Sequence, residues 1–156
     1  MDFQLEGKTA LITGASRGIG EGTAKVLAQD GVKCVISARR MDLLEQLADD
    51  IEASDGVRPI TIRSDLFERD ATRKLAAAAE DALGHVDILV NSAGRSKHPD
   101  APRHTPFDHR DAAWDDEMHL NYSTIRQISF ALLPGMIEQR YGRIINITGK
   151  SEPEKI

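Results

Sequence analysis

The stretch that decides the fold of this chain is Thr13-Gly14-Ala15-Ser16-Arg17-Gly18-Ile19-Gly20. It follows the apolar run 9–12 and precedes a helical pattern of apolar residues that extends to residue 28. Strand, glycine turn and helix, in this order, form the context in which backbone N–H groups at a helix N-terminus bind phosphate. The stretch therefore predicts a site for the diphosphate of a dinucleotide.

Each glycine of this loop has an expected physical role. Gly14 allows a tight turn after the strand, Gly18 allows backbone to approach a diphosphate, and Gly20 allows the helix to pack closely on the sheet. The spacing is Gly-x-x-x-Gly-x-Gly and no Gly-Lys-Ser/Thr is present, which disfavours a nucleoside-triphosphate P-loop. A merely tight connection is the alternative, and the strand before the loop and the helix after it favour dinucleotide binding.

The composition is that of an ordinary globular domain, and 156 residues predict a single one. A net charge of -5 argues against nucleic acid or an anionic membrane as the main partner. No signal peptide or membrane-spanning run is recognisable. Cys34 is the only cysteine and lies in an apolar run, which predicts a buried structural thiol. We therefore expect a cytoplasmic protein.

Apolar runs and helical patterns alternate along the chain. The predicted strands are 9–12, 34–38, 60–62, 86–90 and 143–148. The first predicted helix follows the glycine loop and ends near residue 28, and three more are predicted at 43–51, 68–83 and 114–140. Such alternation predicts an α/β fold in which a doubly wound parallel sheet of about five strands carries helices on both faces.

Polar or glycine residues follow every predicted strand. They are Gly14 to Gly20, Arg39-Arg40, Asp65, Asn91 to Gly94, and Thr148-Gly149. Because ligands of such sheets bind at the carboxyl ends of the strands, we expect these residues to form one site.

Five motifs, in order and correctly spaced between residues 3 and 148, resemble those of the short-chain dehydrogenase/reductase family. They are Thr13-Gly14-x-x-x-Gly18-Ile19-Gly20, Asp65-Leu66, Asn91-Ser92-Ala93-Gly94, Trp114 with Asn121 seven residues on, and Gly142-Arg143-Ile144-Ile145-Asn146-Ile147. The resemblance implies that residues 1–156 form a single, incomplete NAD(P)-binding Rossmann-like domain that lacks the C-terminal part of the family fold. It also implies reversible hydride transfer between a nicotinamide cofactor and a small-molecule carbonyl or alcohol.

The resemblance assigns roles to individual residues. The implied cofactor-binding residues are Gly14, Ser16, Arg17, Gly18, Ile19, Gly20, Arg39, Arg40, Asp65, Leu66, Asn91, Ala93 and Gly94. Among them, Asp65 would hydrogen-bond the adenine amino group, and its alternative is a turn or helix-cap aspartate. Ser92 departs from the second asparagine that the family more often has. Asn121, the one implied catalytic residue, would bend the long helix and hold a water of the proton relay.

The charge after the second predicted strand decides the expected cofactor. Family members that prefer NAD(H) resemble one another in an acidic residue at this strand end, where this chain has Ala38 followed by Arg39 and Arg40. Arginine can hold a 2′-phosphate by charge-assisted bonds, whereas a carboxylate would repel it. Arg17 could reach the same phosphate. We predict NADP(H) over NAD(H); the alternative is that Arg39 and Arg40 are solvated residues ahead of a helix.

The chain departs from the family pattern at the catalytic serine, tyrosine and lysine. The serine position falls on Gly149, and the Tyr-x-x-x-Lys motif would lie beyond residue 156. The two tyrosines, Tyr122 and Tyr141, lie elsewhere and do not form it. Two hypotheses stay open: an oxidoreductase whose proton-transfer residues are absent from this chain, or a truncated, catalytically silent nucleotide-binding or assembly module.

Two further expectations concern partners and metals. The strand 143–148 would be an apolar sheet edge, and the helix before it is more apolar than one buried face requires, so we predict a homo-oligomer. His98, His104 and His109 match no zinc spacing, so no metal site is predicted.

Overall fold

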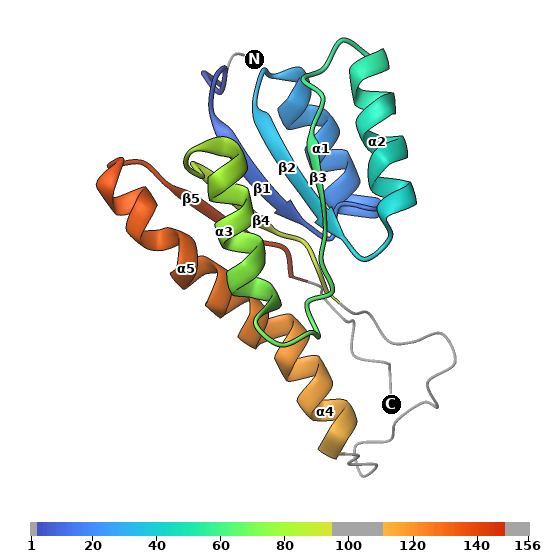
Figure 1. Cartoon of the computed structure of the whole chain (residues 1–156), viewed down its shortest axis with the longest axis vertical. Helices are drawn as coiled ribbons and strands as arrows, with labels where there is room; N and C mark the ends of the chain where they lie inside the picture. The colour runs from blue at the N-terminus through green and yellow to red at the C-terminus, as the bar shows by residue number, and fades with distance from the viewer. Residues whose placement is uncertain (1–2, 95–110, 149–156) are drawn as a thin grey trace, which may run out of the picture.

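The computed structural model describes residues 3–94 and 111–148, with side chains from residue 115 onward in the second range. These residues form one parallel sheet of five strands in the order β3-β2-β1-β4-β5 (Figure 1). The strands are β1 (Thr9–Thr13), β2 (Lys33–Ala38), β3 (Ile60–Arg63), β4 (Ile88–Asn91) and β5 (Arg143–Asn146). The helices are α1 (Gly18–Gln29), α2 (Met41–Ala53), α3 (Ala71–Leu83), α4 (Asp111–Met118), the π-helix η1 (His119–Ser123) and α5 (Thr124–Glu138). The predicted α/β, Rossmann-like fold is confirmed.

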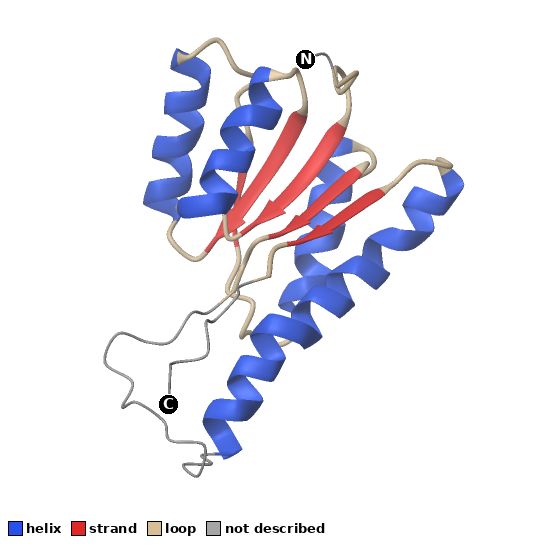
Figure 2. Cartoon of the chain, turned by 180° about the vertical axis from the view of Figure 1, so that it is seen from behind, coloured by secondary structure: helices blue, strands red, loops and turns tan. Residues whose placement is uncertain are grey.

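Each face of the sheet has its own pair of covering helices, α1 with α2 and α3 with α5 (Figure 2). In β1, Ile12 belongs to the apolar cluster that contains Leu44 of α2, whereas its neighbour Leu11 belongs to the cluster that contains Leu132 of α5. All four side chains are fully buried. A strand that is covered on both faces reads as a continuous apolar run, which is why residues 9–12 show no alternation.

The strand order brings the loops after β1 and β4 together. The chain passes from β1 to β2 and β3 on one side, then crosses to β4 and β5 on the other, so the direction changes between β1 and β4. Thr13 is paired in register with Ser37 of β2 and Asn91 of β4. At the opposite end of the sheet, Thr9 N donates to Oδ2 of the buried Asp87 (3.1 Å), and Asp87 N donates to Thr9 Oγ1 (3.0 Å). The point between β1 and β4 is where doubly wound sheets bind ligands.

Two predicted helices differ from the observed ones. α3 begins at Ala71 instead of residue 68, because Asp70 has a left-handed φ of +60° that an α-helix cannot contain. The long helix begins at Asp111 and is interrupted by η1 between α4 and α5. The last strand ends at Asn146, two residues before the predicted end.

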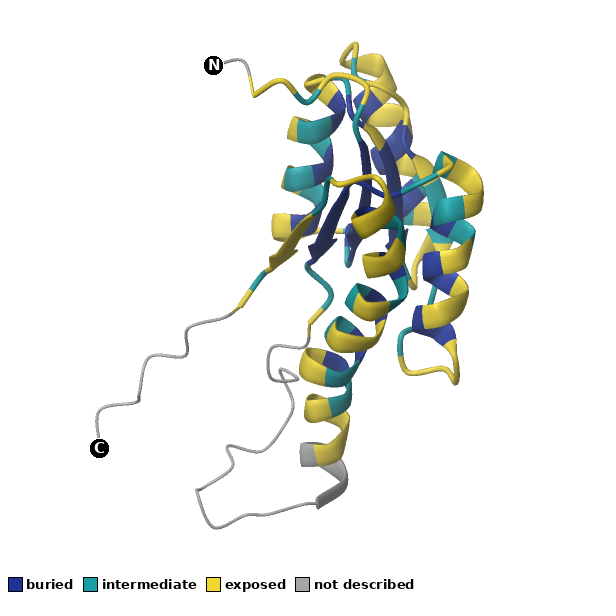
Figure 3. Ribbon diagram, turned by 90° about the vertical axis from the view of Figure 1, so that its left-hand side faces the viewer, coloured by how far each residue is buried: buried dark blue, intermediate teal, exposed yellow. Residues whose placement is uncertain are grey.

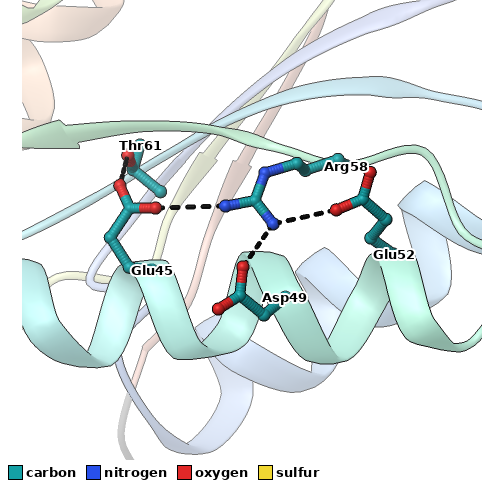
Figure 4. Close-up of polar contacts among 5 residues, drawn as sticks. All are labelled: Glu45, Asp49, Glu52, Arg58 and Thr61. Carbon is teal, nitrogen blue, oxygen red and sulfur yellow. Dashed lines mark hydrogen bonds and ion pairs between the residues drawn. The ribbon is translucent and has the colours of Figure 1, made fainter.

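The β3 edge of the sheet is tied to α2 by polar side chains (Figure 4). Arg58 donates to Asp49 (2.5 Å), Glu52 (3.1 Å) and Glu45 (3.2 Å), and Glu45 also accepts a hydrogen bond from Thr61 of β3. We call these five residues the Arg58 network. The hydrogen bond from Arg58 to Asp49 raises the pKa of the Arg58 guanidinium. The network therefore fastens the outer strand to the helix that precedes it in the chain.

The β5 edge is apolar and exposed (Figure 3). We call Phe130, Leu133 and Ile137 of α5, with Ile144 and Ile145 of β5, the open edge; all five side chains are exposed. Between helix and strand lies a groove of about 510 Å³ that Leu133, Ile137 and Ile144 help to line. This agrees with the expected apolar sheet edge.

Candidate functional site

The glycine loop lies in close backbone contact with the end of β4. Gly14 has φ +66°, and a Cβ atom there would lie 2.7 Å from Cα of Ala93. A Cβ atom at Gly20 would lie 2.6 Å from the carbonyl oxygen of Gly14. A Cβ atom at Gly18, by contrast, would meet no atom within 4 Å. The loop is therefore tightly packed against neighbouring backbone at Gly14 and Gly20, whereas Gly18 faces open space.

The first turn of α1 is not capped by a side chain. Arg17 is the N-cap residue, has extended backbone and makes no side-chain capping hydrogen bond. Ser16 is half-buried, whereas Arg17 and Ile19 are exposed. Backbone N–H groups at an uncapped helix N-terminus carry the positive end of the helix dipole and suit an anionic ligand.

Arginines gather at the ends of β2 and β3. Arg39 and Arg40 follow β2 and are exposed. Arg63, which sequence reasoning did not select, is the last residue of β3 and pairs in register with Ala38. Its Nε donates to the carbonyl oxygen of Arg39 (3.2 Å). The sequence shows Arg63 directly after a predicted strand, but only the pairing of β3 with β2 places it beside Arg39.

Asp65 and Leu66 lie in the loop between β3 and α3, and both are half-buried. Asp65 Oδ1 accepts a hydrogen bond from Phe67 N (3.1 Å), so the carboxylate closes a turn. Of the alternative stated for Asp65, the turn is therefore observed, whereas the helix cap is not, because the N-cap residue of α3 is Asp70. The carbonyl oxygen of Leu66 contacts Nε2 of His119 in η1 at 3.0 Å.

The residues after β4 are held by side chains of β1 and β5. Thr13 Oγ1 accepts hydrogen bonds from Ser92 N (3.2 Å) and Ala93 N (3.1 Å). Asn91 is only 2% exposed, and its Nδ2 donates to Asn146 Oδ1 (2.9 Å). The buried Asn91 side chain thus joins β4 to the exposed strand β5, and Thr13 is a positioning residue that the sequence did not reveal as such.

Asn121 lies in the π-turn of the long helix. The N–H of Thr124 donates to the carbonyl oxygen of His119, five residues earlier, which widens the helix at this point. A Cβ atom at Gly94 would lie 3.4 Å from Oδ1 of Asn121. The side chain of Asn121 therefore comes next to the end of the Asn91–Gly94 segment. π-turns often occur at functional sites, because the extra residue redirects side chains.

Several sequence-based expectations fall outside the described residues. They are the loop 95–110 with its three histidines, the side chain of Trp114, and Gly149 with the residues after it. Among the residues that the structure does describe, no three His, Cys, Asp or Glu side chains are grouped as a metal site would need. No helix in the same part of the chain has the length and apolarity to cross a membrane. Burial raises the pKa of the Cys34 thiol to about 12, which suits a structural role and not a nucleophile.

Sequence comparison finds a family model, described as short chain dehydrogenase, that matches residues 8–154. Nodulation protein G of Rhizobium sp. (strain N33) is 38% identical over 146 residues, which are 94% of this chain and 56% of that protein. Gluconate 5-dehydrogenase of Gluconobacter oxydans is 37% identical over 145 residues, with 93% of this chain and 54% of that protein covered. The chain spans about half the length of the curated relatives it matches.

Solved structures share the fold. A metagenomic short-chain oxidoreductase in complex with NADP has a TM-score of 0.84 and 33% identity, and the match covers 97% of this chain and 66% of that one. A 7α-hydroxysteroid dehydrogenase complexed with NADH has a TM-score of 0.83 and 33% identity, with 93% and 54% covered. Neighbours of equal similarity thus bind either of the two nicotinamide cofactors.

Proposed function

Because the chain belongs to the short-chain dehydrogenase family, we propose that the carboxyl ends of β1, β2, β3 and β4 bind NADP(H). The observation that carries this proposal is the fit of the glycine loop. At Gly14 and Gly20 the space that a Cβ atom would need is filled by the backbone of Ala93 and of Gly14, respectively, while Gly18 and the uncapped start of α1 face open space. A diphosphate needs such a cradle of accessible N–H groups.

The proposal gives each predicted residue a task. Backbone N–H groups of α1, with Ser16, would hold the diphosphate, and Ile19 would cover it. Asp65 and Leu66 would hold the adenine, and the backbone of Ala93 and Gly94 would form the opposite wall. Since the Asn91 side chain is buried, Asn91 would act by fixing that wall through Asn146 and not by touching the cofactor.

The predicted reaction belongs to the whole protein. When bound, the nicotinamide would supply or accept a hydride, and a small carbonyl or alcohol would be its counterpart. Within this chain, Asn121 would orient a water beside Gly94 for proton transfer, supported by its place in the π-turn. The Tyr-x-x-x-Lys pair of the family is absent from residues 1–156.

The preference for NADP(H) rests on charge. Arg39 and Arg40 follow β2, Arg17 is the N-cap residue of α1, and Arg63 donates to the carbonyl oxygen of Arg39. A phosphate at this point would have guanidinium groups from neighbouring strand ends available for charge-assisted bonds.

A glycine pair tests the binding site. In Gly18→Ala the new methyl group enters open space inside the proposed cradle, so binding of NADPH should fall at least tenfold in a fluorescence titration. Gly84→Ala is the matched control, because Gly84 also has positive φ (+82°) and nothing within 4 Å of its Cβ position. Both variants should lose about 1–2 kcal/mol of folding free energy from the left-handed backbone. Equal NADPH affinity of the two variants would contradict the proposed site.

A charge-removal pair tests the cofactor preference. Combined Arg39→Gln and Arg40→Gln substitutions should weaken NADPH binding about 10- to 100-fold, as expected for one or two charge-assisted bonds, and leave NADH binding unchanged. Lys33→Gln, at the other end of β2, removes a charge from the same strand and should change neither affinity. Wild-type protein that binds NADH as tightly as NADPH would overturn the preference.

The second candidate function is a catalytically silent nucleotide-binding or assembly module. It is favoured by Gly149 at the family's serine position. NADPH binding without NADPH-dependent carbonyl reduction by the natural gene product would support this alternative. Reduction of any carbonyl in a panel by that product would exclude it.

The proposal includes a homo-oligomer and a cytoplasmic location. The open edge supports association, because an apolar strand edge beside apolar helix residues invites pairing with another chain. With a single, buried cysteine the domain relies on no disulfide, which is usual for proteins of a reducing compartment.

A further inference from the structure

We propose that His119 is a positioning residue that fixes the Asp65-Leu66 segment and thereby the adenine end of the site; this rests on the proposed function. Nε2 of His119 contacts the carbonyl oxygen of Leu66 at 3.0 Å. The His119 ring also stacks on Phe67, with ring centroids 5.9 Å apart and an interplanar angle of 29°. One side chain thus contacts both residues that follow Asp65. We call this pair of contacts the His119 clasp.

The clasp joins parts of the chain that are distant in sequence. The turn at Asp65 is otherwise closed by local bonds, from Phe67 N to Asp65 Oδ1 (3.1 Å) and from Glu68 N to the Asp65 carbonyl (2.9 Å). Such bonds shape the turn without fixing where it lies relative to the rest of the site. Leu66 also packs against the apolar cluster of α3 and α5, and Ser64 N donates to the carbonyl oxygen of Ala38 (3.0 Å). His119, 53 residues from Leu66 and part of η1, adds to this packing a directional hydrogen bond that fixes the orientation of the Leu66 carbonyl.

The π-turn relates the clasp to Asn121. His119 and Asn121 both lie in η1, two positions apart, and residues two apart on a helix point to different sides. His119 reaches Leu66 after β3, while Oδ1 of Asn121 lies beside Gly94 after β4. A single helical turn therefore sets the distance between the adenine segment and the segment proposed to hold the catalytic water.

The chemistry of the contact defines its proton. A carbonyl oxygen can only accept a hydrogen bond, so Nε2 of His119 carries a hydrogen and donates the hydrogen bond to the carbonyl oxygen of Leu66. The Nε2–H tautomer and the imidazolium both satisfy this requirement, so the clasp needs no change of protonation. Glutamine can place an N–H donor at a similar position, whereas phenylalanine retains the ring without a donor.

Binding of NADPH fragments distinguishes a local effect of the His119 clasp on the adenine end of the site from a general loss of structure. The probes are 2′,5′-ADP, which carries the adenine, reduced nicotinamide mononucleotide, which lacks it, and NADPH. His119→Phe should weaken 2′,5′-ADP and NADPH binding about fivefold, the value of one neutral hydrogen bond, and leave the mononucleotide affinity unchanged. His119→Gln should restore most of the loss. Met118→Ala, which truncates an exposed neighbour, is the control and should change none of the three affinities.

Hydrogen exchange keeps the inference testable if the proposed function fails. Without ligand, His119→Phe should speed amide exchange in residues 65–68 and leave β1 and β4 protected as in the wild type. If wild-type protein binds none of the probes, the proposed function is wrong, and this exchange result still decides whether His119 holds the segment. Folded His119→Phe with unchanged exchange in residues 65–68, or unchanged 2′,5′-ADP affinity in a binding-competent protein, would overturn the inference.

Discussion

The two edges of the sheet are built in opposite ways. At β3, the Arg58 network ties the outer strand to α2 through three carboxylates and one hydroxyl. At β5, every strand residue is exposed, and the open edge presents apolar side chains from both strand and helix. Both outer strands have four residues and parallel partners, so length and pairing do not explain the contrast.

The contrast concerns what each edge requires from outside. The polar side chains of the Arg58 network find their partners within α2, β3 and the residues just before β3, so they need no group from outside. The apolar side chains of the open edge would be buried only by another surface. While they are exposed to solvent, they contribute little hydrophobic free energy to folding. In the proposed homo-oligomer, a second copy of the chain would supply that surface.

The largest expected effect separates the sheet centre from the open edge. Ile36→Ala in β2 removes a fully buried side chain and should cost about 3 kcal/mol of unfolding free energy. Ile145→Ala in β5, where the side chain is 46% exposed, should cost less than about 1 kcal/mol. Urea denaturation followed by circular dichroism measures both. Equal losses would show that Ile145 is already covered in solution.

Alkaline pH gives the next largest effect, in the half of the sheet that the Arg58 network closes. Burial raises the pKa of Cys34 from 9.0 to about 12, so above pH 9 the unfolded state loses a proton that the folded state keeps. Stability from this thiol is complete below pH 9 and is lost as the pH rises towards 12, by about 2 kcal/mol at pH 10.5. Between pH 8 and 10.5, the free energy of unfolding measured by denaturant titration should therefore fall more steeply for the wild type than for Cys34→Ala. An equal pH dependence of the free energy of unfolding in both proteins would mean that the Cys34 thiol is accessible to solvent in the folded state.

Removing the centre of the Arg58 network should have a smaller, salt-dependent effect. Arg58→Gln leaves Glu45, Asp49 and Glu52 without their shared cation, so the urea midpoint should fall at 50 mM NaCl. The fall should shrink in 1 M NaCl, where the Debye length is about 3 Å. Lys33→Gln provides the control for loss of one exposed charge. A fall that is the same at both salt concentrations would exclude an electrostatic tie at this edge.

The smallest effect on folding comes from a charge placed on each edge. Ile145 (46% exposed) and Ile60 (43% exposed) are matched isoleucines of β5 and β3. Either change to lysine should alter folding stability by about 0.5 kcal/mol or less. Of the two changes, Ile145→Lys should reduce self-association in sedimentation velocity, because of the two sheet edges it is the open edge that has exposed apolar residues on both strand and helix. Wild-type protein that is monomeric at micromolar concentration would contradict the proposed oligomer.

Much of the site could be predicted because its signals are local. The glycines of residues 14–20, the arginines after β2 and Asp65-Leu66 each follow an apolar run, and parallel strands place such ends on one side of the sheet. The use of each side chain was less predictable. Asn91 donates to Asn146, 55 residues away, a partner that no sequence pattern indicates. The turn at Asp65 is local, and it was one of the alternatives that the sequence offered.

The sequence by itself determined the alternation of strands and helices, because apolar periodicity and glycine punctuation act over a few residues. Only the tertiary structure decided that Arg63 lies against Arg39, that His119 reaches Leu66, and that the helix takes a π-turn at Asn121. The first two features join segments far apart in the chain, and their geometry depends on strand order and register. The π-helical turn is local, but only the structure shows which residues it brings beside Leu66 and Gly94. It also decided which edge is closed, since an arginine ahead of one strand finds three carboxylates only once α2 packs beside it.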